Sequence, residues 1–288
     1  MKLGIITPAL TLLPRAHAQW EETADVATIV GIVREAERLG YHHCTCSEHV
    51  AVPVDVAEVR GSRYWDPLAT FGYLAAVTER IKLATHVLVL AYHHPLEIAK
   101  RYGTLDVVSG GRLILGVGVG SLREEFDLLG APFADRGARA DDALRALRAA
   151  LSQPAPEYAG SHYEFTGFLV DPCAQQDEVP IWIGGRTYRS LRRAVELADG
   201  WAPFGLRRAE IAEFLNRARA SDAWEARARP LEVILQNEHP LDPGAEPERV
   251  AEQVQRLADA GATGLNVRFV HHSPAHYREQ LAALRTIV

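Results

Sequence analysis

Eight short β-rich segments alternate with eight longer amphipathic segments along the whole chain, and this alternation restricts the fold more than any other feature. The pattern is typical of βα units built around a parallel sheet. The expected strands begin near Lys2, Tyr41, Ile81, Arg112, Pro180, Gly200, Leu231 and Gly264. The expected helices are Thr23 to Leu39, Pro67 to Val77, Leu96 to Val108, Arg139 to Leu151, Tyr188 to Ala198, Arg208 to Ala220, Glu248 to Ala260 and Ala275 to Ile287.

The count of eight favours a closed (β/α)8 TIM barrel over a doubly wound open sheet, which would show the same alternation. Such barrels usually have about 250 residues or more, so we expect a single domain over residues 1–288. Gly40, Gly200 and Gly261 each follow an expected helix, and we expect each to take the left-handed conformation there. Residues 152–179 lack a strong helical period and indicate a loop insertion or small hairpin after the fourth helix.

Composition narrows the function and the location. Hydrophobic residues make up 48% of the chain and charged residues 24%, which are ordinary globular values. The net charge of −6 offers no basic surface for nucleic acid or anionic membranes. The first seven residues resemble a strand rather than a signal peptide, because their apolar run is short and ends at Pro8. We therefore expect a cytoplasmic protein without a nucleic-acid or membrane partner.

The cysteines predict neither a disulfide framework nor a metal site. Only Cys44, Cys46 and Cys173 are present, and the first two lie two residues apart in an expected strand. Their side chains would share one face, as buried small hydrophobic residues do. A zinc site would need further ligands at suitable spacing, so no metal is expected.

The site of a parallel barrel is built by the loops that follow its strands, so polar residues at strand ends are the candidates. The second strand ends in Ser47, Glu48 and His49, which places a carboxylate beside an imidazole. His49 could orient a substrate, act as an acid or base, or pack on a planar cofactor. It could equally be a loop histidine that hydrogen bonds to the backbone.

The third strand carries Thr85, His86 and Val87 and runs into Tyr92, His93 and His94. These side chains could line a pocket, although His94 followed by proline is also typical of a helix start. Consecutive histidines point in different directions. We therefore expect one pocket residue and one surface residue here rather than a joint metal site.

Glycines mark the ends of the fourth and fifth strands. Gly116, Gly118 and Gly120 alternate ahead of Ser121 and either let the backbone approach a ligand or relieve crowding inside the barrel. The Gly-x-Gly-x-x-Gly motif of dinucleotide-binding folds is absent. The fifth strand ends in Gly184, Gly185, Arg186 and Thr187 just before a helix, where backbone N–H groups and a cation favour a phosphate; the alternative is a simple glycine turn.

Several segments resemble one known family. The residues that carry the resemblance are Leu105 to Gly120, Arg123 to Phe126, Leu129-Gly130, Pro132-Phe133, Arg136-Gly137, Pro180 to Gly185 and Ala198 to Trp201. They closely resemble the luciferase-like monooxygenase superfamily, and within it the branch of oxidoreductases that use the deazaflavin coenzyme F420. The matched segments extend from the first strand to at least the sixth.

This resemblance implies a (β/α)8 barrel, often dimeric, that binds a flavin or deazaflavin at the strand ends. Ser47-Glu48-His49 matches a segment that supplies an active-site histidine in deazaflavin-dependent sugar-phosphate dehydrogenases, so His49 and Glu48 are the catalytic candidates. The peptide His86-Val87 falls where deazaflavin enzymes have a non-proline cis bond that supports the ring. The implied cofactor-binding residues are Thr85, His86, Val87, Gly118, Gly120, Ser121, Gly184, Gly185, Arg186 and Thr187.

Two departures from those dehydrogenases disfavour glucose 6-phosphate as the substrate. Ser121 stands where they have a catalytic glutamate, and Pro53 stands where they have a tryptophan. Relatives in the closer branch have an arginine at the position of His93 and an aromatic residue at that of Ser121. Both changes alter ligand contacts.

Three functions remain open from the sequence. The first is hydride transfer by coenzyme F420 to or from a small organic substrate, with His49 as acid, base or hydrogen-bond donor. The second is a monooxygenase that uses reduced FMN and oxygen together with a partner reductase. The third is a flavin-binding protein without turnover. Aromatic residues in the insertion could cover the pocket or form a satellite core: Tyr158, Tyr163 and Phe165.

Overall fold

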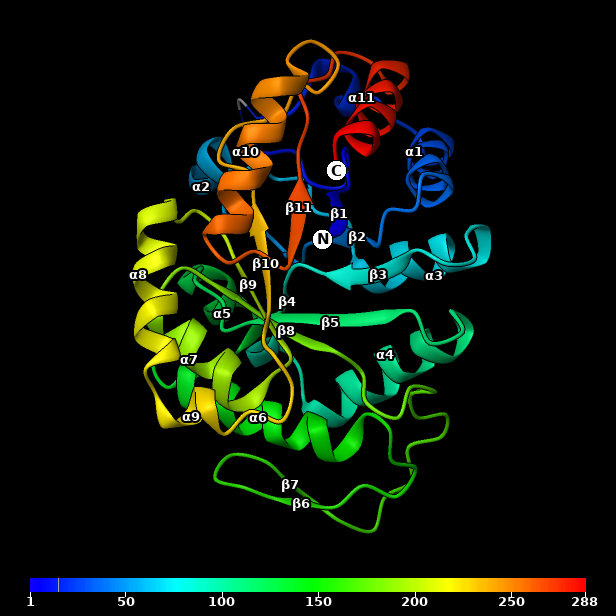
Figure 1. Cartoon of the computed structure of the whole chain (residues 1–288). Coiled ribbons are helices and arrows are strands. Elements are labelled where there is room, and N and C mark those ends of the chain that lie inside the picture. The colour runs from blue at the N-terminus through cyan, green and yellow to red at the C-terminus, as the bar shows by residue number, and fades with distance from the viewer. Residues whose placement is uncertain (15) are drawn as a thin grey trace.

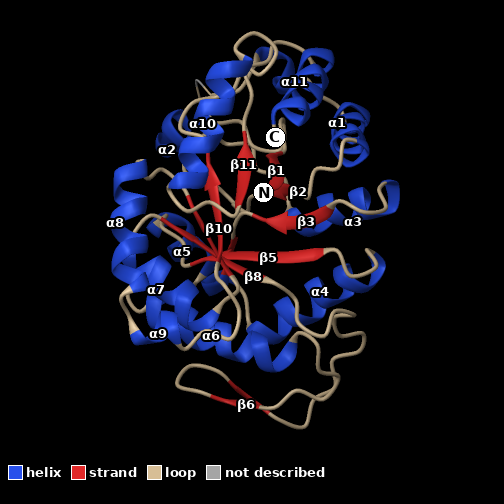
Figure 2. Ribbon diagram, in the orientation of Figure 1, coloured by secondary structure: helices blue, strands red, loops and turns tan. Residues whose placement is uncertain are grey.

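Parallel strands close into a barrel at the centre of the molecule, and helices surround it (Figures 1 and 2). The computed structural model describes residues 1–14 and 16–288. The strands follow the order β3-β2-β1-β11-β10-β9-β8-β5-β4, and a pairing between β3 and β5 closes the ring. Their bounds are β1 (Lys2–Ile6), β2 (His43–Cys46), β3 (Lys82–Thr85), β4 (Leu88–Val89), β5 (Leu113–Gly118), β8 (Ile181–Gly185), β9 (Gly200–Pro203), β10 (Glu232–Gln236) and β11 (Gly264–Val267).

The third expected strand is split in two. Strands β3 and β4 are separated by His86 and Val87, whose peptide bond is cis, as the resemblance implied. Both pair in parallel with β5, so together they occupy one place in the ring. The barrel therefore has the eight strand positions that the sequence predicted.

All eight expected helices are present. The largest boundary differences are at Val26 and Arg136, each three residues from the expected start. Their bounds are α1 (Val26–Arg38), α3 (Pro67–Val77), α4 (Pro95–Val108), α6 (Arg136–Ala150), α7 (Tyr188–Leu197), α8 (Arg208–Arg219), α10 (Pro247–Asp259) and α11 (Pro274–Ile287). Short elements that no sequence pattern predicted are η1 (Gln19–Glu22), α2 (Val54–Arg60), η2 (Leu90–Tyr92), α5 (Arg123–Leu129) and α9 (Asp222–Glu225).

Two of the three expected glycine helix ends are confirmed. Gly40 and Gly261 have φ of +77° and +105°. The prediction for Gly200 is wrong, because this residue begins β9 instead. A Cβ there would lie 2.5 Å from Cδ1 of Trp182, so glycine is needed for close packing between strands rather than for a turn.

The insertion after α6 forms a small antiparallel hairpin of β6 (Tyr158–Ala159) and β7 (Glu164–Phe165). Figure 2 shows it outside the ring of helices. Tyr158 donates a hydrogen bond of 2.6 Å to Asp142 of α6, and Phe165 is buried against the core. The insertion aromatics thus pack on the outside of the barrel and do not cover its mouth.

Inside the barrel, small and large apolar side chains form a floor below the strand ends: Ala84, Ile114, Trp182, Ala202 and Ile234. A much larger apolar cluster lies between the strands and the surrounding helices. Both Cys44 and Cys46 belong to it and are buried, as expected. No helix of the described residues is both long enough and apolar enough to cross a membrane.

Candidate active site

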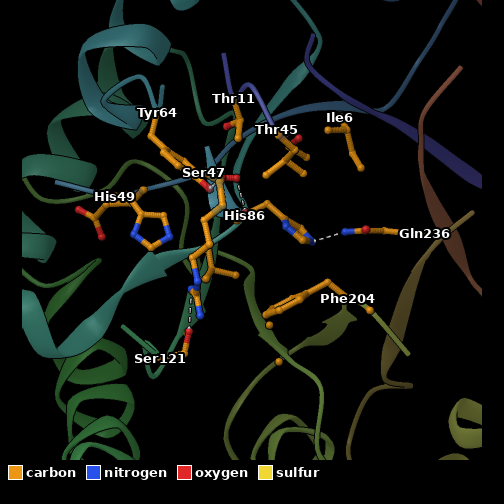
Figure 3. Close-up of a pocket in the computed structure, with 18 of the residues that line it drawn as sticks. Ile6, Thr11, Thr45, Ser47, His49, Tyr64, His86, Ser121, Phe204 and Gln236 are labelled. Atoms are coloured by element: carbon orange, nitrogen blue, oxygen red, sulfur yellow. Dashed lines mark hydrogen bonds between the residues drawn. The ribbon is translucent and has the colours of Figure 1, made fainter. Parts of the chain in front are cut away.

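A cavity of about 1200 Å³ opens above this floor, at the carboxyl ends of the strands. Figure 3 shows side chains from several strands and loops pointing into it. Eleven of the twelve candidate residues line it: Glu48, His49, His86, Val87, Gly118, Gly120, Ser121, Gly184, Gly185, Arg186 and Thr187. The barrel thus brings together residues that lie up to 139 positions apart, from Glu48 to Thr187.

Thr85 is the candidate that does not line the cavity. Its side chain is fully buried, and Oγ1 donates a hydrogen bond of 2.7 Å to the carbonyl oxygen of Gly116 on β5. Strand alternation explains the difference, because Ala84 and His86 face the barrel interior and Thr85 faces the other way. The hydrogen bond from Thr85 to Gly116 holds β3 and β5 together.

His49 is held by a carboxylate from a distant part of the chain. Nδ1 of His49 lies 2.7 Å from Oε2 of Glu125, whose side chain is completely buried. The imidazole also packs edge-on against Tyr64, with ring centroids 4.5 Å apart. Figure 3 shows these two rings on the same side of the cavity. The alternative of a histidine bonded to backbone is therefore not the arrangement found.

Glu125 accepts four hydrogen bonds. Besides His49, the donors are the hydroxyl of Tyr92 at 2.8 Å and the backbone N–H groups of Val50 at 2.6 Å and Ala51 at 3.2 Å. Burial alone would raise the pKa of Glu125, but the hydrogen bonds from His49, Tyr92 and Val50 outweigh it and lower this pKa. The carboxylate is therefore ionised and fixes the proton of His49 on Nδ1.

Glu48 lines the cavity but makes different contacts. Oε2 accepts the backbone N–H of Val89 at 2.7 Å, and Oε1 lies 2.7 Å from Nε2 of His93. Burial would lower the pKa of His93, but the hydrogen bond and the charge of Glu48 raise it. Glu48 thus holds both ends of η2, through Val89 and His93, against the segment that follows β2. His94 caps α4 and packs on Tyr163, so the two consecutive histidines do diverge. The expectation that one of them would be a pocket residue is wrong, because neither lines the cavity.

The cis peptide stands at the centre of the cavity wall. The carbonyl oxygen of His86 accepts a hydrogen bond of 2.8 Å from Oγ of Ser47. Nε2 of the same histidine lies 3.3 Å from Nε2 of Gln236, and Figure 3 shows the two side chains meeting from different strands. Burial lowers the pKa of His86, which keeps its ring neutral.

The strand glycines make room for Val87. A Cβ on Gly118 would lie 2.7 Å from Cγ2 of Val87, and one on Gly184 would lie 2.4 Å from Cγ1. A Cβ on Gly120, whose φ is +75°, would lie 2.6 Å from the ring of Phe126. These glycines therefore relieve crowding, which is one of the two open interpretations. They also leave bare backbone at the cavity wall, but its close approach to a ligand stays a prediction.

Positive charge dominates the cavity although the chain is acidic overall. The arginines in its lining are Arg60, Arg136, Arg186, Arg189, Arg193 and Arg268. The carboxylates in its lining, Glu21 and Glu48, already accept backbone N–H groups. A cavity with such a balance attracts anionic ligands.

The turn from β8 into α7 has the geometry expected of an anion site. Gly185 has φ of +138°, and Thr187 is the N-cap residue of α7 but makes no capping hydrogen bond with its side chain. Arg186 and Thr187 are exposed to the cavity side, and α7 contributes its free N–H groups there. This arrangement is typical of a phosphate-binding helix start.

The sequence missed two kinds of site residue. Glu125 stands in α5, a seven-residue helix without a marked apolar period, so nothing in the pattern placed it near His49. Of the arginines in the lining, only Arg186 was a candidate, because the others come from helices and loops whose positions depend on the whole barrel. Strand alternation would have indicated Arg268, because this polar residue lies two positions beyond Asn266, whose side chain faces the barrel interior.

Comparisons with known proteins agree with this arrangement. Residues 1–282 match the family described as "Luciferase-like monooxygenase". A Mycobacterium tuberculosis protein with the name "Putative coenzyme F420-dependent oxidoreductase" is 31% identical over 162 residues, which are 52% of this chain and 46% of that protein.

Two solved structures share the fold over the whole chain and 98% of their own chains. The monooxygenase RslO1 from Streptomyces bottropensis has a TM-score of 0.76 at 20% identity. The coenzyme F420-dependent tetrahydromethanopterin reductase from Methanopyrus kandleri has a TM-score of 0.76 at 17% identity. With a family match over nearly all of its length, this chain belongs to the luciferase-like monooxygenase family and is an enzyme of the oxidoreductase or monooxygenase type.

Proposed function

We propose that this protein uses coenzyme F420 to transfer hydride to or from a small organic substrate. The observation that carries the proposal is the pairing of His49 with buried Glu125 at the wall of an arginine-lined cavity. Hydride transfer at a carbon that bears a hydroxyl needs an acid–base group for the hydroxyl proton. The likeness to F420-dependent proteins supports this cofactor.

The residues present fit a phosphate-bearing planar cofactor. Gly184 to Thr187, at the start of α7, would hold a phosphate, with Arg186 as the counter-charge. The bare backbone of Gly118 and Gly120 and the side chain of Val87 would lie against the ring. When bound, the deazaflavin supplies a ring carbon that accepts or donates hydride.

His49 would move the proton that accompanies the hydride. Because Glu125 fixes one proton on Nδ1, the neutral imidazole has Nε2 as its acceptor, and Nε2 has no hydrogen-bond partner among the described residues. As hydride leaves the substrate carbon, the O–H bond breaks, its proton goes to Nε2 and the C=O bond forms. In the opposite direction Nε2 returns the proton.

Fluorescence titration of the purified protein with oxidised F420 and with FMN, under identical conditions, tests the cofactor. We expect F420 to bind more tightly, and we expect Gly184→Ala to weaken it at least about tenfold because the new methyl group displaces Val87. Gly72→Ala is the matched control, since nothing lies within 4 Å of its added Cβ on α3. Tight FMN binding with weak F420 binding would contradict the proposal.

The second candidate is a monooxygenase that uses reduced FMN and oxygen, supplied by a partner reductase. The likeness to the monooxygenase RslO1 supports it to the same extent as the likeness to the F420-dependent reductase supports the first candidate, because both similarities extend over the whole chain. Oxygen uptake by the protein mixed with reduced FMN, compared with reduced F420, separates the two candidates. A storage protein without turnover is disfavoured by the acid–base pair and by the open cavity. We further propose that the protein is cytoplasmic and that it forms a homodimer. Analytical ultracentrifugation would measure the oligomeric state.

A further inference from the structure

One arginine of the cavity differs from the others. Nε of Arg268 is buried and has no hydrogen-bond partner among residues 1–14 and 16–288. By contrast, Arg136 donates to the carbonyl oxygen of Gly120 at 3.2 Å, and Arg193 pairs with Asp141. Arg186 is exposed. Arg268 is half-buried as a residue, and its buried Nε has hydrogen-bonding capacity that none of the described residues uses.

The backbone holds this side chain at the barrel mouth. The N–H of Arg268 donates to Oδ1 of Asn237 at 2.9 Å, and its carbonyl oxygen accepts from Leu241 at 2.8 Å. Arg268 follows β11, two residues beyond Asn266, which faces the barrel interior and lies 2.5 Å from Nε2 of His43. Strand alternation thus points Arg268 to the same interior side, in the lining of the cavity.

No carboxylate in the lining is available to neutralise Arg268. Glu21 accepts the backbone N–H groups of Ala9 at 2.8 Å and Ala18 at 2.7 Å, and Glu48 is engaged by His93. Burial lowers the pKa of Arg268, with no charged neighbour offsetting it. A buried cation without a counter-ion is unfavourable unless a ligand supplies one.

Its position separates this cation from the cofactor-phosphate region. Strands β9 and β10 lie between β11 and β8, where α7 begins. On its other side β11 adjoins β1, and β1 adjoins β2, which leads to His49. An anion on Arg268 would therefore lie on the His49 side of the barrel. The lining near β11 combines apolar residues, such as Ile6 and Phe269, with polar ones, such as Thr7 and Gln236.

We propose that Arg268 binds an anionic group of the substrate, so that the substrate is an organic carboxylate or phosphate. The inference rests on the proposed function in placing the cofactor phosphate at α7. The guanidinium would donate two parallel hydrogen bonds to the anion, and the mixed polar and apolar lining would contact the rest of the molecule. This anchor fixes which carbon faces His49 and thereby selects the substrate.

Three probes of similar shape test the proposal: benzoate, phenyl phosphate and the neutral benzamide. Binding is measured by thermal unfolding at constant ionic strength, in cofactor-free protein and in protein loaded with F420. We expect benzoate or phenyl phosphate to bind about tenfold more tightly than benzamide. Preference for benzoate identifies a carboxylate substrate, and preference for phenyl phosphate identifies a phosphate substrate.

Three variants locate the effect. Arg268→Gln should abolish the preference for the anion, and Arg268→Lys should keep part of it. Arg249→Gln, on the exposed face of α10, removes the same charge and should change nothing. Since Arg268 is unpaired, the cofactor-free Arg268→Gln protein should unfold at the same or a higher temperature than the wild type, which shows that the loss is not misfolding.

Two outcomes would overturn the proposal. One is equal binding of anionic and neutral probes to the wild-type protein. The other is weaker F420 binding in Arg268→Gln without any effect on the probes, which would assign Arg268 to the cofactor. The measurement on cofactor-free protein does not depend on F420. If F420 proves not to be the cofactor, the preference of Arg268 for anionic probes can therefore still be tested.

Discussion

The two ends of the barrel use histidine in opposite ways. At the closed end, His43 lies between Nδ1 of His42 at 3.0 Å and Oδ1 of Asn266 at 2.5 Å, so both ring nitrogens are engaged. At the open end, His49 bonds to Glu125 through one nitrogen only. A histidine with both nitrogens engaged is a packing element, whereas one with a free nitrogen can exchange a proton.

The two ends of the barrel also differ in how their charged groups are paired. At the closed end Lys2 pairs with Glu232 at 2.5 Å, and Trp182 donates to the same carboxylate at 3.2 Å. At the open end the arginines outnumber the acidic groups that could neutralise them. The charged groups at the closed end are therefore paired within the protein, whereas those at the open end leave positive charge that an anionic ligand would balance.

The largest expected effect is on turnover at the open end. His49→Ala should lower kcat by about 10²- to 10⁴-fold, because the proton acceptor is removed. Steady-state rates of F420 reduction with a substrate found by screening would measure it. His162→Ala, on the outer hairpin, is the control and should leave the rate unchanged. A decrease in kcat of less than tenfold for His49→Ala would show that His49 is not the proton acceptor.

At the closed end the corresponding effect is on stability. Trp182 is fully buried and packs edge-on against His43, with centroids 5.0 Å apart. Trp182→Ala should lower the free energy of unfolding by about 3–5 kcal/mol, because it leaves a cavity in the floor. Urea denaturation would measure this loss. Trp224→Ala, in the half-buried α9, should lower the free energy of unfolding by less. Equal losses for the two variants would show that the barrel floor does not contribute more to stability than α9.

Acid should lower the free energy of unfolding through the two histidines at the closed end, His42 and His43. Burial lowers the pKa of His43 to about 3, and burial together with Lys2 lowers that of His42 to about 4. Between these values and the unfolded value of about 6.5, the unfolded chain binds more protons. Stability is therefore fully present above pH 6.5 and falls as the pH is lowered.

The expected size for His43 alone is about 2 kcal/mol between pH 7 and pH 5. Urea midpoints at several pH values would measure it, with the His43→Asn variant as the comparison. The variant should show a shallower dependence on pH over this range. Parallel curves for the two proteins would mean that His43 does not titrate with unfolding.

The smallest expected effect concerns the rim of the open end. Arg60 is half-buried and donates to Oγ of Ser121 at 3.2 Å in a solvent-exposed hydrogen bond. Arg60→Gln should weaken F420 binding only a few-fold, because exposed charges are screened. Titration at low and high salt should show the difference shrinking as salt increases. A salt-independent loss would instead indicate a direct hydrogen bond to the ligand.

The same contrast explains how much the sequence predicted. The barrel and its helices followed from local patterns, since each strand and helix has its own period and ends. Gly118, Gly184 and His49 could be found because they stand where strands end. Glu125 could not, because its role depends on α5 meeting the end of β2, which no local pattern encodes. Thr85 could have been excluded by strand alternation alone.

The four hydrogen bonds of Glu125 have a consequence for the timing of each catalytic cycle. All lone-pair directions of this carboxylate are used, so it has no capacity to relay a proton onward from His49. Under the proposed function, a proton that His49 receives from a substrate would have to leave through the same nitrogen by which it arrived. Water or the departing product would then have to take this proton once per turnover, so product departure and proton loss would share one exit.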